Sequence, residues 1–353
     1  MGSVLLTLAK SFHPGNMFRP ANPPTAIPLP LLITGVAGVA GYNALRYFRK
    51  KHPGRVFGIH QVDNLQLTGP GVVACNAEDR DGLDRLFEQH EFGAVLDCAG
   101  NCALRACEMN PQLAHTINVE GVRNLILQSV SRGIRLVHLS VDLVFSGSGD
   151  GGYTEADRPD PVSVYGKTMV AGEQVLVEAD PRACILRISL PMGVSLNGHA
   201  GAIDWIASRF KKSRPATLYF DEIRTPTYTD CLNALCEKML ANDLSGLFHA
   251  GGPRRLSLYQ IAQIINRAGG YDPDCLCGIP RREAGPIPPR AGNVTMDSSK
   301  LARALGYDPF DPWPWDDCLV PTDRDWHRRR PAGEPRSPEY LHKVLCRNPG
   351  SRC

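Results

Sequence analysis

Short apolar runs alternate with longer amphipathic segments through the first half of the chain. The runs predict buried strands at 29–34, 55–60, 71–75, 94–98 and 134–145. Between them, apolar residues recur at helical spacing in 42–50, in 79–90 and in the stretch that ends at Gly133. Strands that alternate with helices indicate a parallel sheet with right-handed crossovers. We therefore predict an α/β fold built on a doubly wound parallel sheet of the Rossmann type.

The pattern loosens beyond Leu186, where the expected strands become short. We predict strands at 217–220 and 246–250 and helices at 202–212, 231–240, 257–268 and 298–305. These elements indicate a smaller C-terminal α/β domain that binds a substrate, although some of its segments can return to the parallel sheet. The expected divisions are a poorly ordered arm at 1–27, the Rossmann domain at 28–190, the smaller domain at 191–320 and a basic, proline-containing tail at 321–353.

A glycine-rich segment joins the first predicted strand to the first predicted helix. It reads G-x-x-G-x-x-G, and the residues expected at a pyrophosphate are Gly35, Ala37, Gly38, Val39, Ala40 and Gly41. Glycine allows a sharp turn and a close backbone approach, and the N-terminus of the following helix carries unpaired N–H groups. The segment predicts that the first domain binds NAD(P), with an ordinary turn as the alternative.

The end of the second predicted strand is expected to contact the adenine ribose. In dinucleotide-binding folds a carboxylate at this place binds the 2′-hydroxyl of NAD, and an Arg accommodates the 2′-phosphate of NADP. Neither residue stands directly there, where the sequence has His60 and Gln61. These two side chains are better suited to binding a 2′-phosphate than to replacing the carboxylate that binds a 2′-hydroxyl. We therefore expect NADP rather than NAD.

The charge balance and the cysteine content argue against a polyanion-coating protein and against a metal site. The 353 residues carry 39 Lys and Arg against 36 Asp and Glu, which is too balanced for a protein that coats a polyanion. The tail at 321–353 is basic, and we interpret it as a solvated extension, with nucleic-acid binding as an unlikely alternative. The 12 Cys fall mostly in apolar runs without zinc-site spacing, so we expect reduced thiols and no metal. Without a signal or membrane segment, a cytoplasmic protein is expected.

Two further motifs carry a family resemblance. Residues 140–145 read S-V-D-L-V-F, and residues 165–169 read Y-G-K-T-M. Together with the glycine loop they resemble the extended short-chain dehydrogenase/reductases, and most closely the dTDP-4-dehydrorhamnose reductases and their relative, the β regulatory subunit of methionine adenosyltransferase. The usual text of that family is S-T-D-Y-V-F-x-G and Y-G-K-T-K. Segments 224–228, 246–252 and 293–301 also match, so the resemblance covers about residues 29–310.

The resemblance implies a catalytic set from which two members are missing. In the family a Tyr, here Tyr165, delivers a proton to a keto oxygen while the nicotinamide delivers hydride. A Lys four residues later lowers the pKa of that Tyr, and a Ser or Thr on the fifth strand binds the same oxygen. These positions hold Met169 and Val141 in this chain.

The resemblance also implies the remaining walls of the site. The cofactor residues carried over by position are Asn76, Ala77, Cys98, Ala99, Gly100, Asn118, Tyr165 and Ser189, and the substrate residues are Asp142, Arg224 and Thr225. Arg224 is expected to pair with a diphosphate, or alternatively to form an ion pair that joins the two domains. Packing of small residues in the core is the alternative for the single cofactor positions.

Two functional hypotheses follow from these residues. The first is an NAD(P)-dependent reductase that acts on a nucleotide-linked 4-keto-sugar, with Tyr165 as the general acid and an atypical supporting set. The second is a catalytically impaired subunit or sensor that binds NAD(P) or a nucleotide sugar, as a homodimer or beside a partner enzyme. The surviving substrate-side motifs favour the enzyme, whereas Val141 and Met169 favour the regulatory protein.

Overall fold

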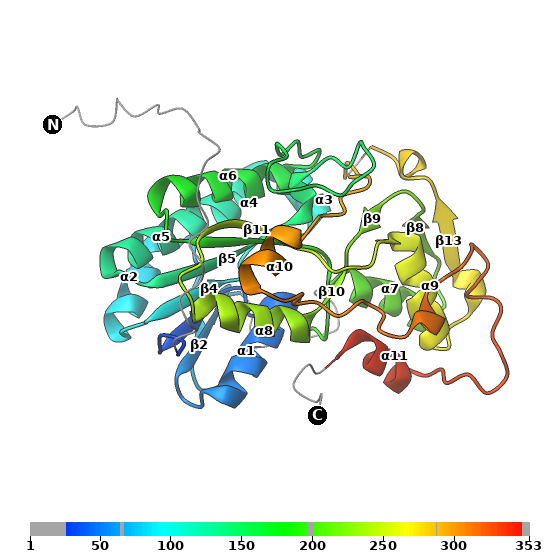
Figure 1. The fold of residues 1–353 in the computed structure, drawn as a ribbon, viewed down its shortest axis with the longest axis horizontal. Coiled ribbons are helices and arrows are strands. Elements are labelled where there is room, and N and C mark those ends of the chain that lie inside the picture. The colour runs from blue at the N-terminus through cyan, green and yellow to red at the C-terminus, as the bar shows by residue number, and fades with distance from the viewer. Residues whose placement is uncertain (1–25, 64–66, 197–200, 287, 348–353) are drawn as a thin grey trace.

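A seven-stranded parallel sheet forms the centre of the protein (Figure 1). The computed structural model describes residues 26–63, 67–196, 201–286 and 288–347. The strands are ordered β11-β6-β5-β4-β1-β2-β3, and neighbouring strands are parallel. Their bounds are β1 (Leu31–Ile33), β2 (Val56–His60), β3 (Val72–Ala74), β4 (Ala94–Asp97), β5 (Arg135–Val141), β6 (Cys184–Ile188) and β11 (Gly246–Ala250). The predicted doubly wound α/β fold is therefore confirmed.

Helices cover both faces of this sheet (Figure 1). One face is covered by α1 (Val39–Lys51) and α8 (Thr229–Leu240), and the other by α2 (Arg80–Gln89), α5 (Gly121–Arg132) and α6 (Val164–Ala179). Successive residues of β1 show why its sequence is apolar throughout. Leu31 and Ile33 pack in the core beneath α1, whereas Leu32 packs in the opposite core beneath α2 and α5. The inner strands β1 and β4 are buried on both faces, as in other two-sided parallel sheets, whereas the edge strand β3 is partly exposed.

Between β4 and β5 the chain forms a broken helical stretch. It consists of α3 (Leu104–Met109), α4 (Pro111–His115) and a π-helical turn at Thr116–Glu120, which continues directly into α5. In the described part of the chain, 3₁₀ turns also form at Asp142–Val144, Pro273–Cys275, Arg281–Glu283 and Asp317–Leu319.

A smaller unit with three two-stranded sheets lies beside the Rossmann sheet (Figure 1). The pairs are β8 (Ala216–Tyr219) with β13 (Leu276–Ile279), β9 (Ile223–Arg224) with β12 (Leu256–Ser257), and β7 (Pro191–Met192) with β10 (Thr227–Tyr228). Its helices are α7 (Ala202–Lys211), α9 (Leu258–Ala268) and α11 (Pro338–Leu345), whereas α10 (Ser299–Leu305) lies against β11 of the parallel sheet, where Lys300 donates to the carbonyl oxygen of Leu247 at 2.7 Å. Ser257 and Gln260 form a capping box that defines where α9 begins.

Residues 246–250, grouped by sequence with the smaller unit, extend the parallel sheet instead. They form β11, which pairs in register with β6 from Gly246↔Cys184 to Ala250↔Ile188. Phe248 and Ala250 are buried in the main core. The apolar side chains of this strand therefore need the apolar neighbours that the parallel sheet and its helices provide. This return to the first sheet was left open by the sequence pattern.

The basic segment beyond residue 321 packs against α9, so its interpretation as a solvated extension is wrong for residues 321–347. The Arg267 guanidinium of α9 lies 4.0 Å from the centre of the Trp326 ring and pairs with Glu334 at 2.7 Å. Leu341 and Val344 of α11 are buried in the main core. Apolar residues at these positions are interleaved with the charges, and they determine where the segment lies. Residues 1–25, most of the expected arm, fall outside the described part of the chain.

A buried histidine connects β11 to the loop that follows β5. His249 is 0% exposed, its Nδ1 lies 2.9 Å from the carbonyl oxygen of Tyr153, and its Nε2 lies 3.4 Å from Nη1 of Arg187. Burial, assisted by the positive charge of Arg187, lowers the pKa of His249 to about 4. The folded protein therefore holds this imidazole neutral well below the pH at which a free one is protonated.

We predict an acid-sensitive contribution of His249 to stability. Between about pH 6.5 and pH 4 the unfolded chain binds a proton that the folded His249 does not, so stability falls as the pH falls. The shift corresponds to a loss of about 3 kcal/mol across that window. Urea denaturation at several pH values should show a shallower acid loss for His249→Gln than for the unmodified protein. Removal of the exposed His342 by His342→Gln serves as the control, and equal pH slopes for all three proteins would contradict the assignment.

Candidate cofactor and active site

The glycine loop after β1 is built so that two of its glycines cannot be replaced without displacement of backbone. Gly35 has a φ of +61°, and a Cβ there would lie 2.4 Å from the carbonyl oxygen of Cys98. A Cβ on Gly41, in the first turn of α1, would lie 2.4 Å from the carbonyl oxygen of Gly35. Gly38 is different, since its φ is −78° and its nearest neighbour would be 3.4 Å away. The loop thus brings backbone close to the N-terminus of α1, where unpaired N–H groups suit a phosphate.

A buried polar network underneath the loop joins β1, β4 and β5. Thr34 donates from Oγ1 to Asp97 Oδ1 at 2.5 Å and accepts the N–H groups of Cys98 and Ala99, each at 3.0 Å. Asp97 Oδ2 lies 2.7 Å from His138 Nδ1. Although burial alone would raise the pKa of Asp97, its hydrogen bonds to His138 and Thr34 lower it. The network holds the two loops at the carboxyl edge of the sheet against each other.

Thr34, Asp97 and His138 were not singled out by the sequence analysis. Thr34 and Asp97 each end an otherwise apolar strand, and both strands are fully buried. Polar residues at the carboxyl ends of adjacent parallel strands meet at one edge of the sheet, so their positions are a usable signal. His138 lies inside β5, where nothing in the sequence distinguishes it from a packed core residue.

The residues expected on the adenine side lie at the carboxyl ends of β2 and β3. His60 is buried, and its Nδ1 lies 2.7 Å from the carbonyl oxygen of Gln61. Asn76 accepts the N–H of Val62 at 2.9 Å through Oδ1, which ties the loop after β2 to the loop after β3. The carbonyl oxygen of Ala77 accepts a hydrogen bond from the Asn124 amide at 3.1 Å. These side chains are thus brought to the same edge as the glycine loop.

Asn118 connects the loop after β4 with α6. Its Oδ1 accepts the N–H of Asn101 at 2.7 Å and its Nδ2 donates to Oγ1 of Thr168 at 2.9 Å. Asn118 lies in the π-helical turn, a distortion often found at functional sites. A Cβ on Gly100 would lie 3.7 Å from Asn118 Oδ1 and 3.9 Å from Met169 Sδ. Gly100, Asn118 and Met169 therefore surround one place beside the glycine loop.

Tyr165 lies near the beginning of α6 and is almost completely buried. Ser163 caps the helix by accepting the N–H of Gly166 at 3.1 Å. Tyr165 is 5% exposed and packs in one cluster with Met169 and Val141. Burial raises the pKa of Tyr165 well above its usual value of 10, and the negative charge of Asp142 raises it further. Arg224 is the cation that acts in the opposite direction.

Arg224 forms a buried ion pair between the two units of the chain. Its Nη1 lies 2.7 Å from Asp142 Oδ1, at the end of β5, and its Nη2 lies 2.7 Å from Glu222 Oε1. Ser189 donates to the other oxygen of Asp142 at 2.6 Å and accepts the N–H of Thr225 at 3.2 Å. Arg224 is 6% exposed. Of the two alternatives for this residue, the structure contains the ion pair that joins the domains.

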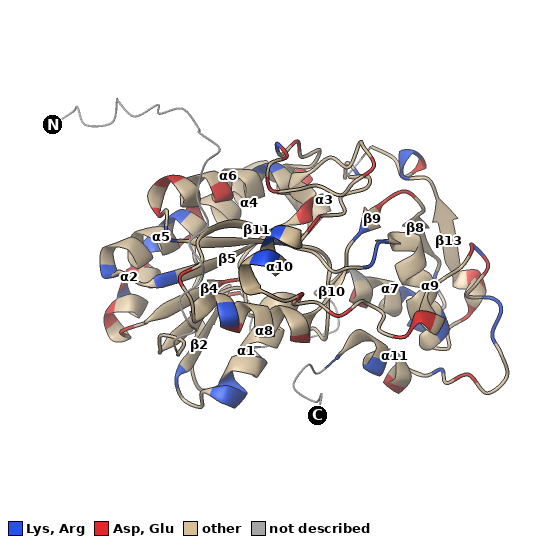
Figure 2. Ribbon diagram, viewed as in Figure 1, with Lys and Arg blue, Asp and Glu red and all other residues tan. Residues whose placement is uncertain are grey.

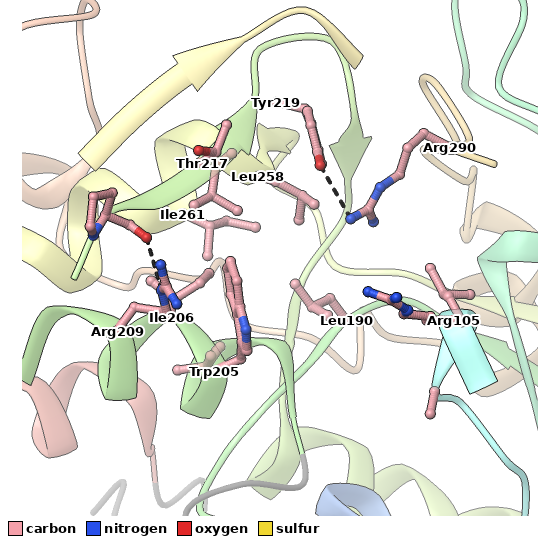
Figure 3. A pocket seen from close by; sticks show the side chains of 15 residues that line it. Arg105, Leu190, Trp205, Ile206, Arg209, Thr217, Tyr219, Leu258, Ile261 and Arg290 are labelled. Carbon is pink, nitrogen blue, oxygen red and sulfur yellow. Dashed lines mark hydrogen bonds between the residues drawn. The ribbon is translucent and has the colours of Figure 1, made fainter. Parts of the chain in front are cut away.

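A cavity of about 650 Å³ opens beside this ion pair, between α3, α7, β8 and α9 (Figure 3). Arg105 and Arg290 approach it from one side in Figure 3, and Arg209 and Trp205 come from α7. The Arg290 guanidinium lies 4.6 Å from the centre of the Tyr219 ring and 3.7 Å from Glu222 Oε2. Leu190, the neighbour of Ser189 in the sequence, lines the same cavity. The sequence analysis did not select these arginines, because they are far apart in the chain and follow no motif.

Two general properties bear on the site. Within the described ranges, no three His, Cys, Asp or Glu side chains gather in a way that could hold a metal ion. In the same part of the chain, none of the helices is both long and apolar enough to span a membrane.

The fold and the glycine cradle define a Rossmann protein of the extended short-chain dehydrogenase/reductase class. The profile of the family described as RmlD substrate binding domain matches residues 30–317. This chain belongs to that family. The matched range includes the glycine loop, Tyr165 and the arginine-lined cavity, and it confirms the resemblance found from the motifs.

Named relatives are similar over most of the chain. The dTDP-4-dehydrorhamnose reductase of Mycolicibacterium smegmatis is 28% identical over 295 residues, which cover 80% of this chain and 82% of the relative. Methionine adenosyltransferase 2 subunit beta of Rattus norvegicus is 26% identical over 285 residues, covering 77% and 81%. Among solved structures, a dTDP-4-dehydrorhamnose reductase from Bacillus anthracis in complex with NADP has a TM-score of 0.70 at 22% identity, covering 80% of this chain and 95% of that chain.

The two kinds of glycine in the loop generate a prediction. Gly41→Ala should reduce the free energy of unfolding by about 1–3 kcal/mol, because the new Cβ would displace backbone at Gly35. Gly38→Ala, the matched control, should cost less than about 1 kcal/mol, since its backbone angles and surroundings accept a methyl group. Urea denaturation of both variants measures the difference. Equal stability of the two would show that the close approach in the loop is not a constraint.

Proposed function

We propose that this protein is an NAD(P)-dependent reductase that acts on a nucleotide-linked 4-keto-sugar, with NADP as the favoured cofactor. One observation carries the proposal: the Asp142–Ser189 contact at the carboxyl edge of the sheet lies next to the arginine-lined cavity. Ser189 bonds Asp142, whose charge acts on Tyr165, while its neighbour Leu190 lines the cavity. A cofactor on the glycine loop and a substrate in the cavity would therefore meet near Tyr165.

The residues of the loop fit a dinucleotide. The close backbone approach at Gly35 and Gly41 leaves room for a pyrophosphate beside the N-terminus of α1, together with Ala37, Gly38, Val39 and Ala40. In this proposal His60 contacts the 2′-phosphate and Asn76 and Ala77 contact the adenine. Cys98, Ala99, Gly100 and Asn118 line the ribose side, and Ser189 belongs to the segment over the nicotinamide. The preference for NADP over NAD in this proposal rests on His60 and Gln61 at the end of β2.

Tyr165 would serve as the acid that protonates the keto oxygen. The nicotinamide supplies the hydride to the carbonyl carbon when it is bound. Because its pKa is raised, Tyr165 keeps its proton at neutral pH, but no lysine at 169 assists its release. Well-placed acid–base assistance contributes about 10²–10⁴-fold to such a rate, so we expect a slow reductase.

The cavity would bind the nucleotide part of the substrate. Arg105 and Arg290 present guanidinium groups from two separate segments, an arrangement that suits the two phosphates of a diphosphate. Tyr219 and the half-exposed Trp205 offer aromatic faces on which a base can stack. In this proposal Arg224, Asp142 and Thr225 form the wall between the cavity and Tyr165, and Arg224 keeps its ion pair rather than binding phosphate.

A catalytically impaired subunit is the second proposed function. The observation that favours it is the replacement of both supporting groups around Tyr165 by the apolar Val141 and Met169, which pack with it. A relative at 26% identity is named as a subunit of methionine adenosyltransferase. In this reading the chain binds NAD(P) or a nucleotide sugar without turnover, as a homodimer or with a partner enzyme.

Binding and turnover separate the two functions. We expect NADPH to bind more tightly than NADH in a fluorescence titration, and NADPH to be oxidised slowly with a dTDP-4-keto-sugar. Tyr165→Phe should remove the turnover while NADPH still binds, because the phenol oxygen is the proton source in this proposal and the glycine loop remains intact. NADPH binding without any turnover by the unmodified protein would reject the reductase and leave the regulatory function.

Restoring the two missing groups should increase the rate. Met169→Lys together with Val141→Thr returns a cation four residues after Tyr165 and a hydroxyl on β5, and we expect at least a tenfold higher kcat. Met169→Gln with Val141→Thr is the matched control, since it adds polarity at 169 without charge. Thermal unfolding of each variant excludes loss of fold. If the charged variant is no faster than the control, the lysine position does not limit the reaction.

A further inference from the structure

A second cavity of about 930 Å³ lies in a groove between α1, α8 and α11, and it shares no residue with the first. Its rim is basic, as the blue segments of α1 and α11 in Figure 2 illustrate. Arg46 and Lys50 lie one turn apart on α1, and His342 and Lys343 come from α11. Neither the glycine loop nor the arginine-lined cavity accounts for this groove.

Most cations of the rim are not neutralised within the protein. Lys51 pairs with Glu237 at 2.5 Å, and Arg347 pairs with Asp311 at 2.7 Å. In contrast, among the described residues Arg46, Lys50 and Lys343 have no carboxylate oxygen within 4 Å. These three positive charges project into a concave space, where they can contact several oxygens of one anionic ligand.

The floor of the groove contains a polar side chain that has no partner in the described part of the chain. Asn233 of α8 lines the groove and is 3% exposed, and none of the described residues forms a hydrogen bond with its amide. Its amide atoms are not among the enclosed polar atoms without a partner, so they open onto the groove and are available to a ligand there. An amide presents one acceptor and two donors, which suits the edge of a nucleobase.

Asp230 lies beside Asn233, three residues earlier on the same helix. It is half-buried, accepts the backbone N–H of Arg347 and lines the groove. Burial raises the pKa of Asp230 to about 6, although the N–H and the charge of Arg347 oppose this. A carboxyl next to an amide accepts and donates in the pattern that base edges require, but it would repel a phosphate. The floor is therefore suited to a base, and the rim to phosphates.

We propose that the groove between α1, α8 and α11 is a second binding site, which takes a nucleoside phosphate. The base contacts Asn233 and Asp230, and the phosphates contact Arg46, Lys50 and Lys343. The volume lies within the range of about 300–1,000 Å³ typical of small-molecule sites. The proposal does not depend on the reductase function, because the two sites have no residue in common.

Calorimetry of the full chain with the four common ribonucleoside triphosphates, tripolyphosphate and adenosine tests the site. Saturating NADPH is present in one series to fill the glycine loop and absent in a second. We expect at least one triphosphate to bind in both series, more tightly than tripolyphosphate. If no triphosphate binds, or if NADPH displaces the bound one, the second site is rejected.

Substitutions in the groove separate its two halves. Arg46→Ala with Lys50→Ala should weaken both triphosphate and tripolyphosphate at least tenfold, because it removes two exposed cations. Lys211→Ala with Lys212→Ala removes two exposed cations elsewhere and should change neither affinity. Asn233→Leu, of similar size, should weaken the triphosphate and leave tripolyphosphate unchanged.

The remaining outcomes are also decisive. Unchanged binding by the Arg46/Lys50 double variant overturns the proposal, even if Asn233→Leu fails to fold. Equal affinity for tripolyphosphate and every triphosphate would show a phosphate surface without base recognition and reject the nucleoside. If NADPH does not bind the protein at all, the reductase proposal fails, while the groove variants still decide the second site.

Discussion

The buried ion pair of Arg224 with Asp142 and Glu222 is the interaction on which the arrangement of the site depends. Asp142 follows β5 of the Rossmann sheet, whereas Arg224 and Glu222 belong to the smaller unit. Charges removed from water are costly unless each is paired and hydrogen-bonded, and here Ser189 satisfies the second oxygen of Asp142. Removing one partner would leave an uncompensated charge, so the two units are held in one relative position. That position sets both the surroundings of Tyr165 and the wall of the adjoining cavity.

The same ion pair limits how much positive charge reaches Tyr165. Arg224 lowers the pKa of Tyr165, but its own charge is balanced by two carboxylates, one of which raises that pKa. A lysine at position 169 would lie one helical turn after Tyr165 in α6. Its charge would not be balanced by the two carboxylates that pair with Arg224. Its replacement by Met169, 3% exposed, turns the environment of Tyr165 apolar. The site therefore retains a proton donor whose charged form is strongly disfavoured.

The spacing of apolar residues along the chain is sufficient to predict the strands of the Rossmann sheet. It does not predict which residues meet at the candidate site. β1, β2, β4 and β5 are largely buried on both faces, so their sequences are mostly apolar and the local pattern identifies them. The glycine loop could be found because Gly35 and Gly41 are required by sterics within seven residues. Arg224 and Asp142 are 82 residues apart, and no local pattern encodes that pairing. Arg105 and Arg290 meet at one cavity for the same long-range reason.

Formal charge gives a misleading view of where this protein can bind an anion. The segment beyond residue 321 is rich in arginine, yet Arg328 pairs with Asp274 and Arg329 with Asp323, while Arg347 pairs with Asp311. A cation that already has a carboxylate partner gains less from an approaching phosphate, because the existing bond must be given up. Arg46 and Lys50 of α1, in contrast, have no such partner among the described residues. The uncompensated charge, rather than the local excess of basic residues, therefore indicates where a polyanion would be held.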